Sequence, residues 1–380
     1  MRPLATELPG SLIRTIANAA MGREDVIPLW FGESDLPTPR AVVEAANASL
    51  SAGDTFYGPN LGIAPLREAL TGYLARIHGA DVSVDQIAVT SSGLNAILLV
   101  LSAIVDPGDE VVVVTPTWPN LIAVPRVLGA VVREVPLRLD GARFVLDLDA
   151  IVGALGPRTR AVILNSPHNP TGWRMPAADM ARLVDELDRR GVWLIADEVY
   201  ARILRPGVDT RSFLSHVDDA GRVIVVNSFS KTWAMTGWRL GWVVAPRAFV
   251  AALERLIEFN TSCAPGFVQR GGIVALGPEG DAFVAMQAER LEAARAAAVA
   301  VLAEDPRILV PETEATFYLF PRIDGLADAE ALAWRAIEHG VGIAPGEAFG
   351  DVGRGHIRLC FARDPAAIRT AAERLLAALR

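Results

Sequence analysis

Short apolar runs rich in β-branched residues alternate with segments of helical spacing, and this alternation constrains the fold more than any other feature of the chain. Most of the runs are continuously apolar, which is typical of parallel strands buried on both faces. We therefore expect an α/β fold with a parallel or mostly parallel sheet flanked by helices. The strands are predicted at residues 86–90, 110–115, 131–136, 160–165, 193–197, 222–226 and 240–244, and the helices between them at 93–104, 121–128 and 176–190.

The pattern changes near Pro278. A long alanine-rich helix is predicted over residues 280–304, and short strands (316–320, 356–361) and helices (327–339, 365–379) follow it. We expect these elements to form a smaller α+β domain, with the long helix as its connection to the large one. The first 45 or so residues are expected to lead from the small domain into the large one. The predicted division is residues 46–279 for the large domain and residues 1–45 with 280–380 for the small domain.

The overall charge excludes several classes of partner. The 380 residues include 36 Lys and Arg against 44 Asp and Glu, a formal net charge of −8 at pH 7. Nucleic acid and anionic membranes are therefore poor partners. The longest apolar runs fall far short of the ~20 residues of a membrane-spanning helix, and no charged-then-apolar leader pattern opens the sequence.

Two cysteines, Cys263 and Cys360, exclude a disulfide scaffold. They offer no metal-ligand spacing, so no metal site is expected. Both are interpreted as reduced residues of a soluble cytoplasmic protein.

Polar residues follow the predicted strands directly. In an open α/β sheet the ligand lies beyond the carboxyl ends of the strands. We therefore expect the site along that edge. The polar segments are Ser91-Ser92-Gly93, Thr115-Pro116-Thr117-Trp118, Asn165-Ser166-Pro167-His168-Asn169-Pro170, Asp197-Glu198-Val199-Tyr200 and residues 227–231.

Lys231 is the only lysine of the chain. Unlike an arginine guanidinium, a lysine amine can lose its proton and become a nucleophile. Its neighbourhood, Ser228-Phe229-Ser230-Lys231-Thr232, lacks the upstream glycines of a phosphate-binding Walker loop. It also lacks the second lysine that Ser-x-x-Lys enzymes of the penicillin-binding type need. A lysine that forms a Schiff base with an aldehyde cofactor remains.

A pyridoxal cofactor needs further partners. Asp197 ends an apolar strand, and a buried carboxylate there would be balanced by the protonated ring nitrogen of the cofactor; a structural carboxylate that caps a loop is the alternative. Ser92 and Gly93 open a helix whose N–H groups favour a phosphate, although an ordinary N-cap would look the same. Ser228 and Arg239 could add donors to that phosphate.

Trp118 is a candidate to lie flat on the pyridine ring. A tryptophan is more often part of a core. This one, however, follows Thr115-Pro116-Thr117 at a strand end, where a core residue is less expected.

Several motifs taken together resemble one family. They appear in the right order and spacing, and the resemblance runs from residue 31, through Tyr57-Gly58-Pro59, to Arg358. The chain resembles the class I/II aminotransferases of pyridoxal-phosphate fold type I, the aspartate aminotransferase-like group. The motifs are Asn169-Pro170-Thr171-Gly172, Asp197-Glu198-Val199-Tyr200, Ser228-Phe229-Ser230-Lys231, Thr236-Gly237-Trp238-Arg239-Leu240-Gly241 and Ile357-Arg358-Leu359.

The resemblance implies a fold and an activity. The fold would be a large domain with a mostly parallel seven-stranded sheet flanked by helices, plus the smaller α+β domain. The activity would be that of a pyridoxal 5′-phosphate-dependent aminotransferase, which moves an amino group between an amino acid and a 2-oxo acid through a Schiff base on Lys231. Lys231 would also carry a proton between the substrate Cα and the cofactor.

The resemblance further implies the residues around the cofactor ring. Asp197 would hold the ring nitrogen, and Asn169 and Tyr200 would hydrogen-bond its phenolic oxygen. Trp118 would stack on the ring. The peptide bond before Pro170 is expected to be cis.

The remaining roles concern the phosphate and the substrate. Tyr57 would reach the phosphate from the neighbouring subunit of a homodimer with shared active sites. Arg358 would hold the substrate α-carboxylate in a bidentate pair, with Gly32 and Asn169 close to it. The phosphate-binding residues of the same chain would be Ser92, Gly93, Leu94 through its backbone, Ser228 and Arg239.

The substrate side-chain pocket stays open, and aspartate, aromatic and broad-range amino acids are all compatible with the sequence. Its candidate residues, each with core packing as the alternative, are Leu12, Ile13, Phe317, Tyr318 and Phe349. Other chemistry of the same scaffold also fits: elimination at Cα or Cβ, carbon–sulfur lysis, or cyclopropane-carboxylate synthesis. A regulator with an aminotransferase-like sensing domain would need a basic DNA-binding module, for which the sequence leaves no residues.

Overall fold

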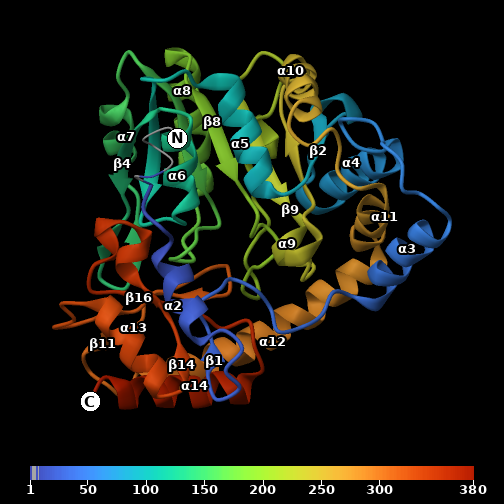
Figure 1. Cartoon of the computed structure of the whole chain (residues 1–380). Coiled ribbons are helices and arrows are strands. Elements are labelled where there is room, and N and C mark those ends of the chain that lie inside the picture. Colours follow the sequence, from blue (N-terminus) through green and yellow to red (C-terminus); the bar gives the residue numbers. More distant parts are fainter. Residues whose placement is uncertain (2–5, 7) are drawn as a thin grey trace.

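The computed structural model describes residues 1, 6 and 8–380. Its centre is a seven-stranded sheet of order β2-β10-β9-β8-β7-β3-β4 (Figure 1). β10 is antiparallel to both neighbours and the other neighbouring pairs are parallel, so the predicted mostly parallel sheet is confirmed. The strands are β2 (Ile87–Thr90), β3 (Glu110–Thr115), β4 (Val131–Pro136), β7 (Thr159–Asn165), β8 (Trp193–Asp197), β9 (Val223–Ser228) and β10 (Gly241–Val244).

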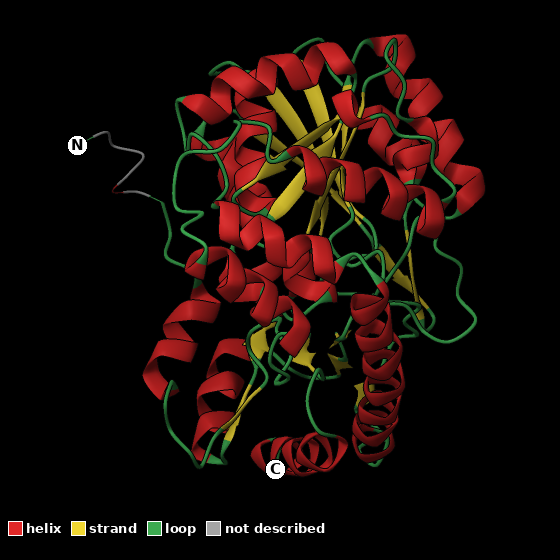
Figure 2. Ribbon diagram, turned by 90° about the vertical axis from the view of Figure 1, so that its right-hand side faces the viewer, coloured by secondary structure: helices red, strands yellow, loops and turns green. Residues whose placement is uncertain are grey.

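Helices cover both faces of this sheet, as Figure 2 shows. Successive strand residues point to opposite faces, so Val111 and Val113 of β3 belong to one hydrophobic core and Val112 and Val114 to the other. The first core is closed by α5 (Gly93–Ile104), α6 (Asn120–Val127) and α10 (Arg247–Glu258). The second is closed by α4 (Ala64–His78), α7 (Leu148–Ala154), α8 (Ala177–Arg190) and α11 (Gly266–Ala275), and α3 (Arg40–Ser51) packs on α11.

A smaller part lies beyond the carboxyl edge of the sheet, and α12 (Pro278–Leu302) runs from the large part into it (Figure 1). The predicted long helix and α+β composition are therefore confirmed. The small sheets pair β1 (Ile27–Pro28) with β14 (Val341–Gly342), β11 (Ile308–Leu309) with β13 (Arg322–Ile323), and β16 (Ile357–Cys360) with β12 (Tyr318–Leu319) and β15 (Ala344–Pro345). The helices here are α2 (Leu12–Ala20), α13 (Ala329–Glu338) and α14 (Pro365–Ala378).

The predicted domain limits, between residues 45 and 46 and between 279 and 280, fall inside α3 and α12, and the division into two domains stays a prediction. The remaining elements are short. They are the hairpin of β5 (Arg138–Asp140) and β6 (Arg143–Val145), helix α9 (Phe229–Thr232), and the 3-10 turns η1 (Val84–Gln86), η2 (Phe213–His216), η3 (Thr236–Trp238), η4 (Gly346–Phe349) and η5 (Asp351–Gly353). No helix among the described residues has the length and apolarity to cross a membrane.

Two features bring the strand ends and the first turn of α5 together. Asn165 at the end of β7 is in register with Asp197 at the end of β8. Gly241, at the start of β10, lies against the beginning of α5: a Cβ atom added there would be 2.7 Å from the backbone nitrogen of Gly93. Only glycine lets these two backbones approach so closely.

Candidate active site

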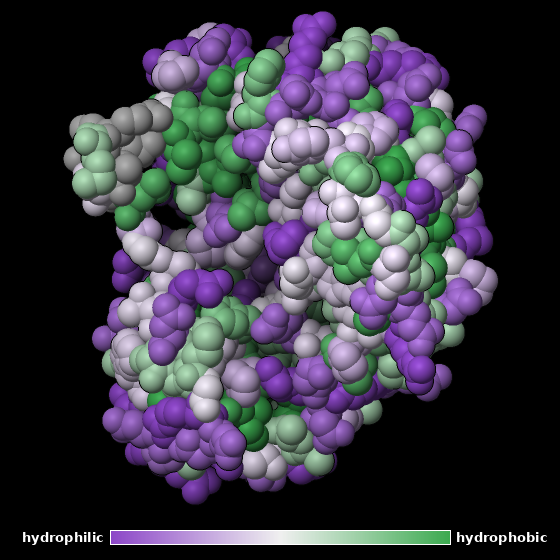
Figure 3. Space-filling view, turned by 45° about the vertical axis from the view of Figure 1, so that its right-hand side comes forward, coloured by the Kyte–Doolittle hydropathy of each residue, from purple (hydrophilic) through white to green (hydrophobic). Residues whose placement is uncertain are grey.

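A cavity of about 730 Å³ lies at the carboxyl edge of the sheet, where the large and small parts meet. The surface is hollowed between these two parts (Figure 3). Most of the predicted site residues line this cavity: Gly32, Gly93, Leu94, Trp118, Asn169, Asp197, Tyr200, Ser228, Lys231, Arg239 and Arg358. Two predicted residues do not. Ser92 is buried directly before α5, and Tyr57 is 91% exposed, outside the cavity of its own chain.

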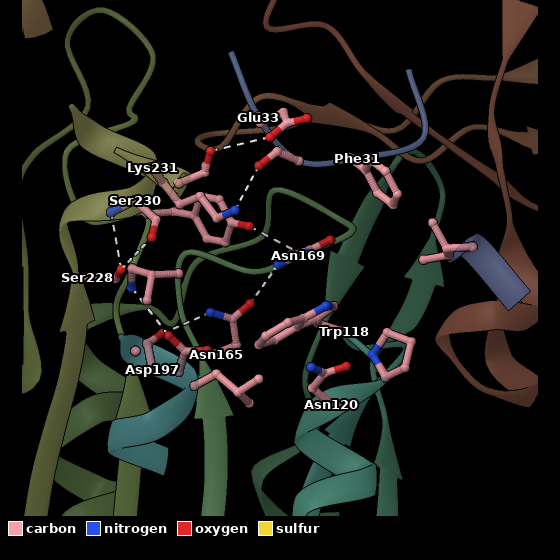
Figure 4. Close-up of a pocket in the computed structure, with 18 of the residues that line it drawn as sticks. Phe31, Glu33, Trp118, Asn120, Asn165, Asn169, Asp197, Ser228, Ser230 and Lys231 are labelled. Atoms are coloured by element: carbon pink, nitrogen blue, oxygen red, sulfur yellow. Dashed lines mark hydrogen bonds between the residues drawn. The ribbon is translucent and has the colours of Figure 1, made fainter. Parts of the chain in front are cut away.

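Lys231 projects into the cavity from α9, directly after β9 (Figure 4). Its Nζ donates a hydrogen bond to the backbone oxygen of Gly32 at 2.7 Å. Burial lowers the pKa of the Lys231 amine to about 8, although Cys360 and Glu33 oppose the shift. A large fraction of this amine is therefore unprotonated under mildly alkaline conditions, as a nucleophile requires.

Asp197 ends β8 and is buried at the bottom of the cavity. Burial raises the pKa of its carboxyl group to about 7, while the Val199 N–H and the charge of Lys231 act in the opposite direction. The Val199 N–H is the one hydrogen-bond donor to the Asp197 side chain in the described part of the chain, at 3.3 Å. A carboxylate so weakly satisfied is suited to a cationic ligand.

Asn165 and Asn169 connect the ends of β7 and β8. Asn165 donates from Nδ2 to the backbone oxygen of Asp197 at 2.9 Å and accepts from the Asn169 N–H at 2.7 Å. The Asn169–Pro170 peptide bond is cis, as expected. Asn165 was not among the predicted site residues, although it ends an apolar strand just as Asp197 does.

A hydrogen-bonded group joins the large part to the small one. Arg358 of β16 donates from Nη1 to Asn169 Oδ1 at 3.1 Å and from Nη2 to the backbone oxygen of Trp30. Its guanidinium lies over the Tyr318 ring, 4.5 Å from the ring centre. Asn169 Nδ2 donates to Tyr200 Oη at 3.4 Å, and the hydroxyls of Tyr200 and Tyr318 lie 2.8 Å apart. The buried Nε of Arg358 has no hydrogen-bond partner within the described residues.

One end of the cavity, around the first turn of α5, carries the predicted anion-binding groups. The first turn of α5 begins at Gly93, and the N–H groups of a first helical turn have no partner inside the helix. Ser92 caps this helix by accepting from the Asn95 N–H at 3.0 Å, and Ser228 caps α9 by accepting from the Ser230 N–H at 3.1 Å. Arg239 lines the cavity and is exposed, and its Nη1 donates a hydrogen bond to the backbone oxygen of Thr236 at 2.7 Å. The site can therefore hold an anion at this end.

The candidates for the side-chain pocket divide into two groups. Ile13 and Tyr318 line the cavity and also belong to the hydrophobic core, whereas Leu12, Phe317 and Phe349 pack in or against that core and do not line the cavity. Several lining residues were not among the predicted site residues, because residue type alone did not distinguish them from ordinary surface or core residues. They are Ser11, Arg14, Phe31, Glu33, Asn120, Asn165, Ser230 and Thr236. Of these, Asn165 and Ser230 do lie in the polar segments that follow the strands.

This set of donors fits pyridoxal 5′-phosphate. Asp197 offers a buried negative charge to a ring nitrogen, Lys231 an amine to an aldehyde, and the first turn of α5 a set of N–H groups to a phosphate. All of these groups line one cavity, and Figure 4 shows Lys231 and Asp197 in it.

A family model for class I and II aminotransferases matches residues 24–375, nearly the whole chain. The chain belongs to this family. Family members use pyridoxal phosphate, and the protein is a pyridoxal-phosphate-dependent aminotransferase of fold type I.

Similar proteins span nearly the full length of this aminotransferase. It is 31% identical to an aspartate aminotransferase of Pyrococcus horikoshii, over 97% of this chain and 94% of that protein. It is 36% identical to the arginine–pyruvate transaminase AruH of Pseudomonas aeruginosa, over 95% and 92%. Among solved structures, the aspartate aminotransferase of Thermus thermophilus with maleate superimposes with a TM-score of 0.93 at 30% identity, covering 100% of this chain and 99% of that one.

The pKa of Asp197 predicts a gain in stability when its charge is removed. Because the folded-state pKa, about 7, lies above the unfolded value of about 3.9, ionisation destabilises the cofactor-free fold progressively as the pH rises from about 4 to about 7. Asp197→Asn should therefore stabilise the cofactor-free protein by ~2–4 kcal/mol at pH 8 and by less at pH 5. Urea unfolding at both pH values measures this difference.

The buried Glu198, whose pKa is also raised to about 7, chiefly by burial, is present in both proteins. The charge of Asp197 contributes to that shift, so Asp197→Asn also lowers the Glu198 pKa and adds to the gain in stability at pH 8. Asp188→Asn, at an exposed position on α8, is the control and should change the stability little at either pH. An equal effect of Asp197→Asn at both pH values would contradict a raised pKa for this carboxyl group.

Proposed function

We propose that Lys231 and Asp197 are the catalytic centre of the aminotransferase, with Tyr200 beside them, and that this centre exchanges an amino group between an amino acid and a 2-oxo acid. The observation that carries the proposal is their position: one cavity holds the only lysine of the chain, a buried carboxylate and the buried Arg358. When bound, the cofactor supplies an aldehyde for the amino group and an electron-withdrawing ring.

Lys231 has two tasks in this proposal. Its Nζ, with a pKa lowered to about 8, acts as the nucleophile toward the aldehyde. When free and unprotonated, the same amine would take up the proton from the substrate Cα and pass it to the cofactor. Asp197 keeps a proton on the ring nitrogen, since a buried carboxylate gains most from a cation beside it.

Arg358 is proposed to bind the substrate α-carboxylate. Its side chain is buried between the rings of Tyr318 and Phe349, and Asn169 fixes its orientation. The guanidinium has five N–H donors, so hydrogen bonds to Asn169 and Trp30 leave others for a carboxylate. Gly32 lies at the same wall of the cavity.

The phosphate is proposed to lie at the first turn of α5. Gly93 and Leu94 would contribute N–H groups there, supported by the hydroxyls of Ser92 and Ser228 and the guanidinium of Arg239. Trp118, at the cavity wall after β3, would stack on the ring (Figure 4).

We further propose a homodimer whose active sites are shared. Phe56, Tyr57 and Phe259 are 85%, 91% and 89% exposed. Their two segments are joined by hydrogen bonds, among them one from the Gly58 N–H to Cys263 Sγ at 3.4 Å. Large exposed aromatic side chains that gather in one place are typical of a protein interface. A second copy would cover them and receive Tyr57 at its phosphate.

A cytoplasmic location is proposed as well. Both cysteines, Cys263 and Cys360, are unpaired in the structure. Unpaired thiols in this number are typical of proteins kept in a reducing compartment.

A half-reaction test addresses the proposed chemistry. Holoenzyme mixed with an amino acid and no acceptor should release one equivalent of 2-oxo acid per site, and an added 2-oxo acid should restore the original spectrum.

Two variants test the residues. Lys231→Arg should lower the rate of transamination by roughly 10³-fold or more, because a guanidinium keeps its proton and cannot carry one from the substrate Cα. Arg358→Lys should raise KM while the cofactor spectrum is retained, because lysine loses the fork. Continuous ammonia release without an acceptor would instead indicate elimination.

Mixed dimers test the shared site. Tyr57→Phe should weaken cofactor binding by ~0.5–1.5 kcal/mol, the contribution of one hydrogen bond. A heterodimer of a Tyr57→Phe chain and a Lys231→Ala chain should contain one site with wild-type cofactor affinity, since each chain lends Tyr57 to its neighbour's Lys231. If every such heterodimer bound cofactor as weakly as Tyr57→Phe alone, Tyr57 would not cross the interface.

A further inference from the structure

Tyr318 lies beside the proposed catalytic centre, and neither the mechanism above nor the sequence motifs assign its hydroxyl a role. It is 1% exposed, on β12 of the small part, and lines the cavity. Its hydroxyl lies 2.8 Å from that of Tyr200, which comes from the large part. Two phenols from different parts of the molecule are thus joined directly at the site.

The surroundings of Tyr318 fix the position of its ring. β12 pairs with β16, so that Tyr318 is opposite Cys360, and the Arg358 guanidinium covers the ring at 4.5 Å. The hydroxyl occupies the space that a side chain at Gly32 would need, since a Cβ there would be 1.7 Å from Tyr318 Oη. Gly32 therefore makes room for this hydroxyl.

The orientation of the Asn169 amide decides one of the hydrogen bonds to Tyr200. Arginine has only donors, so the Asn169 oxygen must be the atom that faces Arg358 Nη1, at 3.1 Å. Nδ2 then faces Tyr200 Oη, at 3.4 Å, and can only donate to it. One lone pair of the Tyr200 oxygen is thereby used.

The other lone pair is available to the Tyr318 hydroxyl, which lies 2.8 Å away and can donate to the Tyr200 oxygen or accept from it. Within the described residues, Tyr200 is the only hydrogen-bond partner of the Tyr318 hydroxyl. Burial raises the pKa of both phenols far above the usual value, so both keep their protons. If Tyr318 donates, the Tyr200 oxygen accepts twice, and the proton of Tyr200 is left to point into the cavity.

We propose that Tyr318 is a positioning residue that holds Tyr200 as a hydrogen-bond donor toward the phenolic oxygen of the cofactor. The inference rests on the proposed function, in which Tyr200 binds that oxygen. A hydroxyl that accepts a hydrogen bond is also a stronger donor, because linked hydrogen bonds polarise one another. Tyr318 therefore acts through Tyr200 and needs no contact with the substrate.

This role has a spectroscopic consequence. A hydrogen bond donated to the phenolic oxygen of the cofactor stabilises the negative charge on that oxygen. The neighbouring nitrogen, which Lys231 contributes, then holds its proton less strongly, so the pKa of that nitrogen falls. The pH at which the visible absorption of the holoenzyme changes is thereby lowered. Losing the Tyr318 hydroxyl should raise that pH.

The experiment is an absorbance titration of four holoenzymes: wild type, Tyr318→Phe, Tyr200→Phe and the double variant. Tyr318→Phe should raise the midpoint by about 0.3 to 1 pH unit, the size of one neutral hydrogen bond. Tyr200→Phe should raise it at least as much. The double variant should match Tyr200→Phe alone, because Tyr318 has no effect once the Tyr200 hydroxyl is gone.

Tyr73→Phe is the matched control. It also removes the hydroxyl of a buried tyrosine, in α4 and outside the cavity, and should leave the midpoint unchanged. Thermal unfolding of each variant verifies that the fold is intact, which is expected because phenylalanine keeps the ring.

The outcomes distinguish a failure of the inference about Tyr318 from a failure of the proposed role of Tyr200. No shift in Tyr200→Phe would overturn the proposed role of Tyr200 itself. A shift in Tyr200→Phe together with none in Tyr318→Phe would overturn only the role of Tyr318. Additive shifts in the double variant would show that Tyr318 acts independently of Tyr200, and would overturn the inference as well.

Discussion

Desolvation at the carboxyl edge of the seven-stranded sheet is the constraint on which the site depends. It acts on two groups of opposite charge and disfavours the charged form of each: the pKa of Asp197 rises to about 7 and that of Lys231 falls to about 8. The sheet positions both groups, because β8 ends at Asp197 and β9 ends directly before α9. A cofactor with a cationic ring nitrogen and an aldehyde would compensate the first group and react with the second. The desolvation of Asp197 and Lys231 therefore destabilises the cofactor-free fold, and a bound cofactor would offset that free-energy cost.

The two parts of the chain contribute different functions to this cavity. In the proposed function, the large part supplies the groups for the cofactor, and the small part supplies Arg358 for the substrate; all of them line the same cavity. Asn169 and Tyr318 hold the two sets together through hydrogen bonds and a ring contact. A paired ion contact between Arg290 of α12 and Asp35, at 2.5 and 2.8 Å, also ties the segment after Gly32 to the long helix. A displacement of the small part would therefore disturb both halves of the site.

Much of this arrangement could be predicted from the sequence. Parallel strands buried on both faces have continuously apolar sequences, and the polar residues that follow them lie at the carboxyl edge of the sheet. Lys231 stood out because no other lysine competes with it. The direction of β10 could not be predicted, since an apolar strand reads alike in both directions. Helix α9 was missed because four residues are too few to show a helical period. The contact of Tyr318 with Tyr200 joins residues 118 positions apart, and no local pattern encodes such a pair.

The pKa of Lys231 in the cofactor-free protein tests the central claim most directly. Since it is the only lysine, an amine-directed reagent reports a single side chain, and peptide mapping separates it from the α-amino group. The labelling rate at Lys231 should rise with pH around a midpoint near 8 in the folded protein, and around roughly 10.4 in the unfolded protein. The same midpoint of roughly 10.4 in the folded protein would mean that water reaches the amine freely, and would contradict the account of a desolvated catalytic edge.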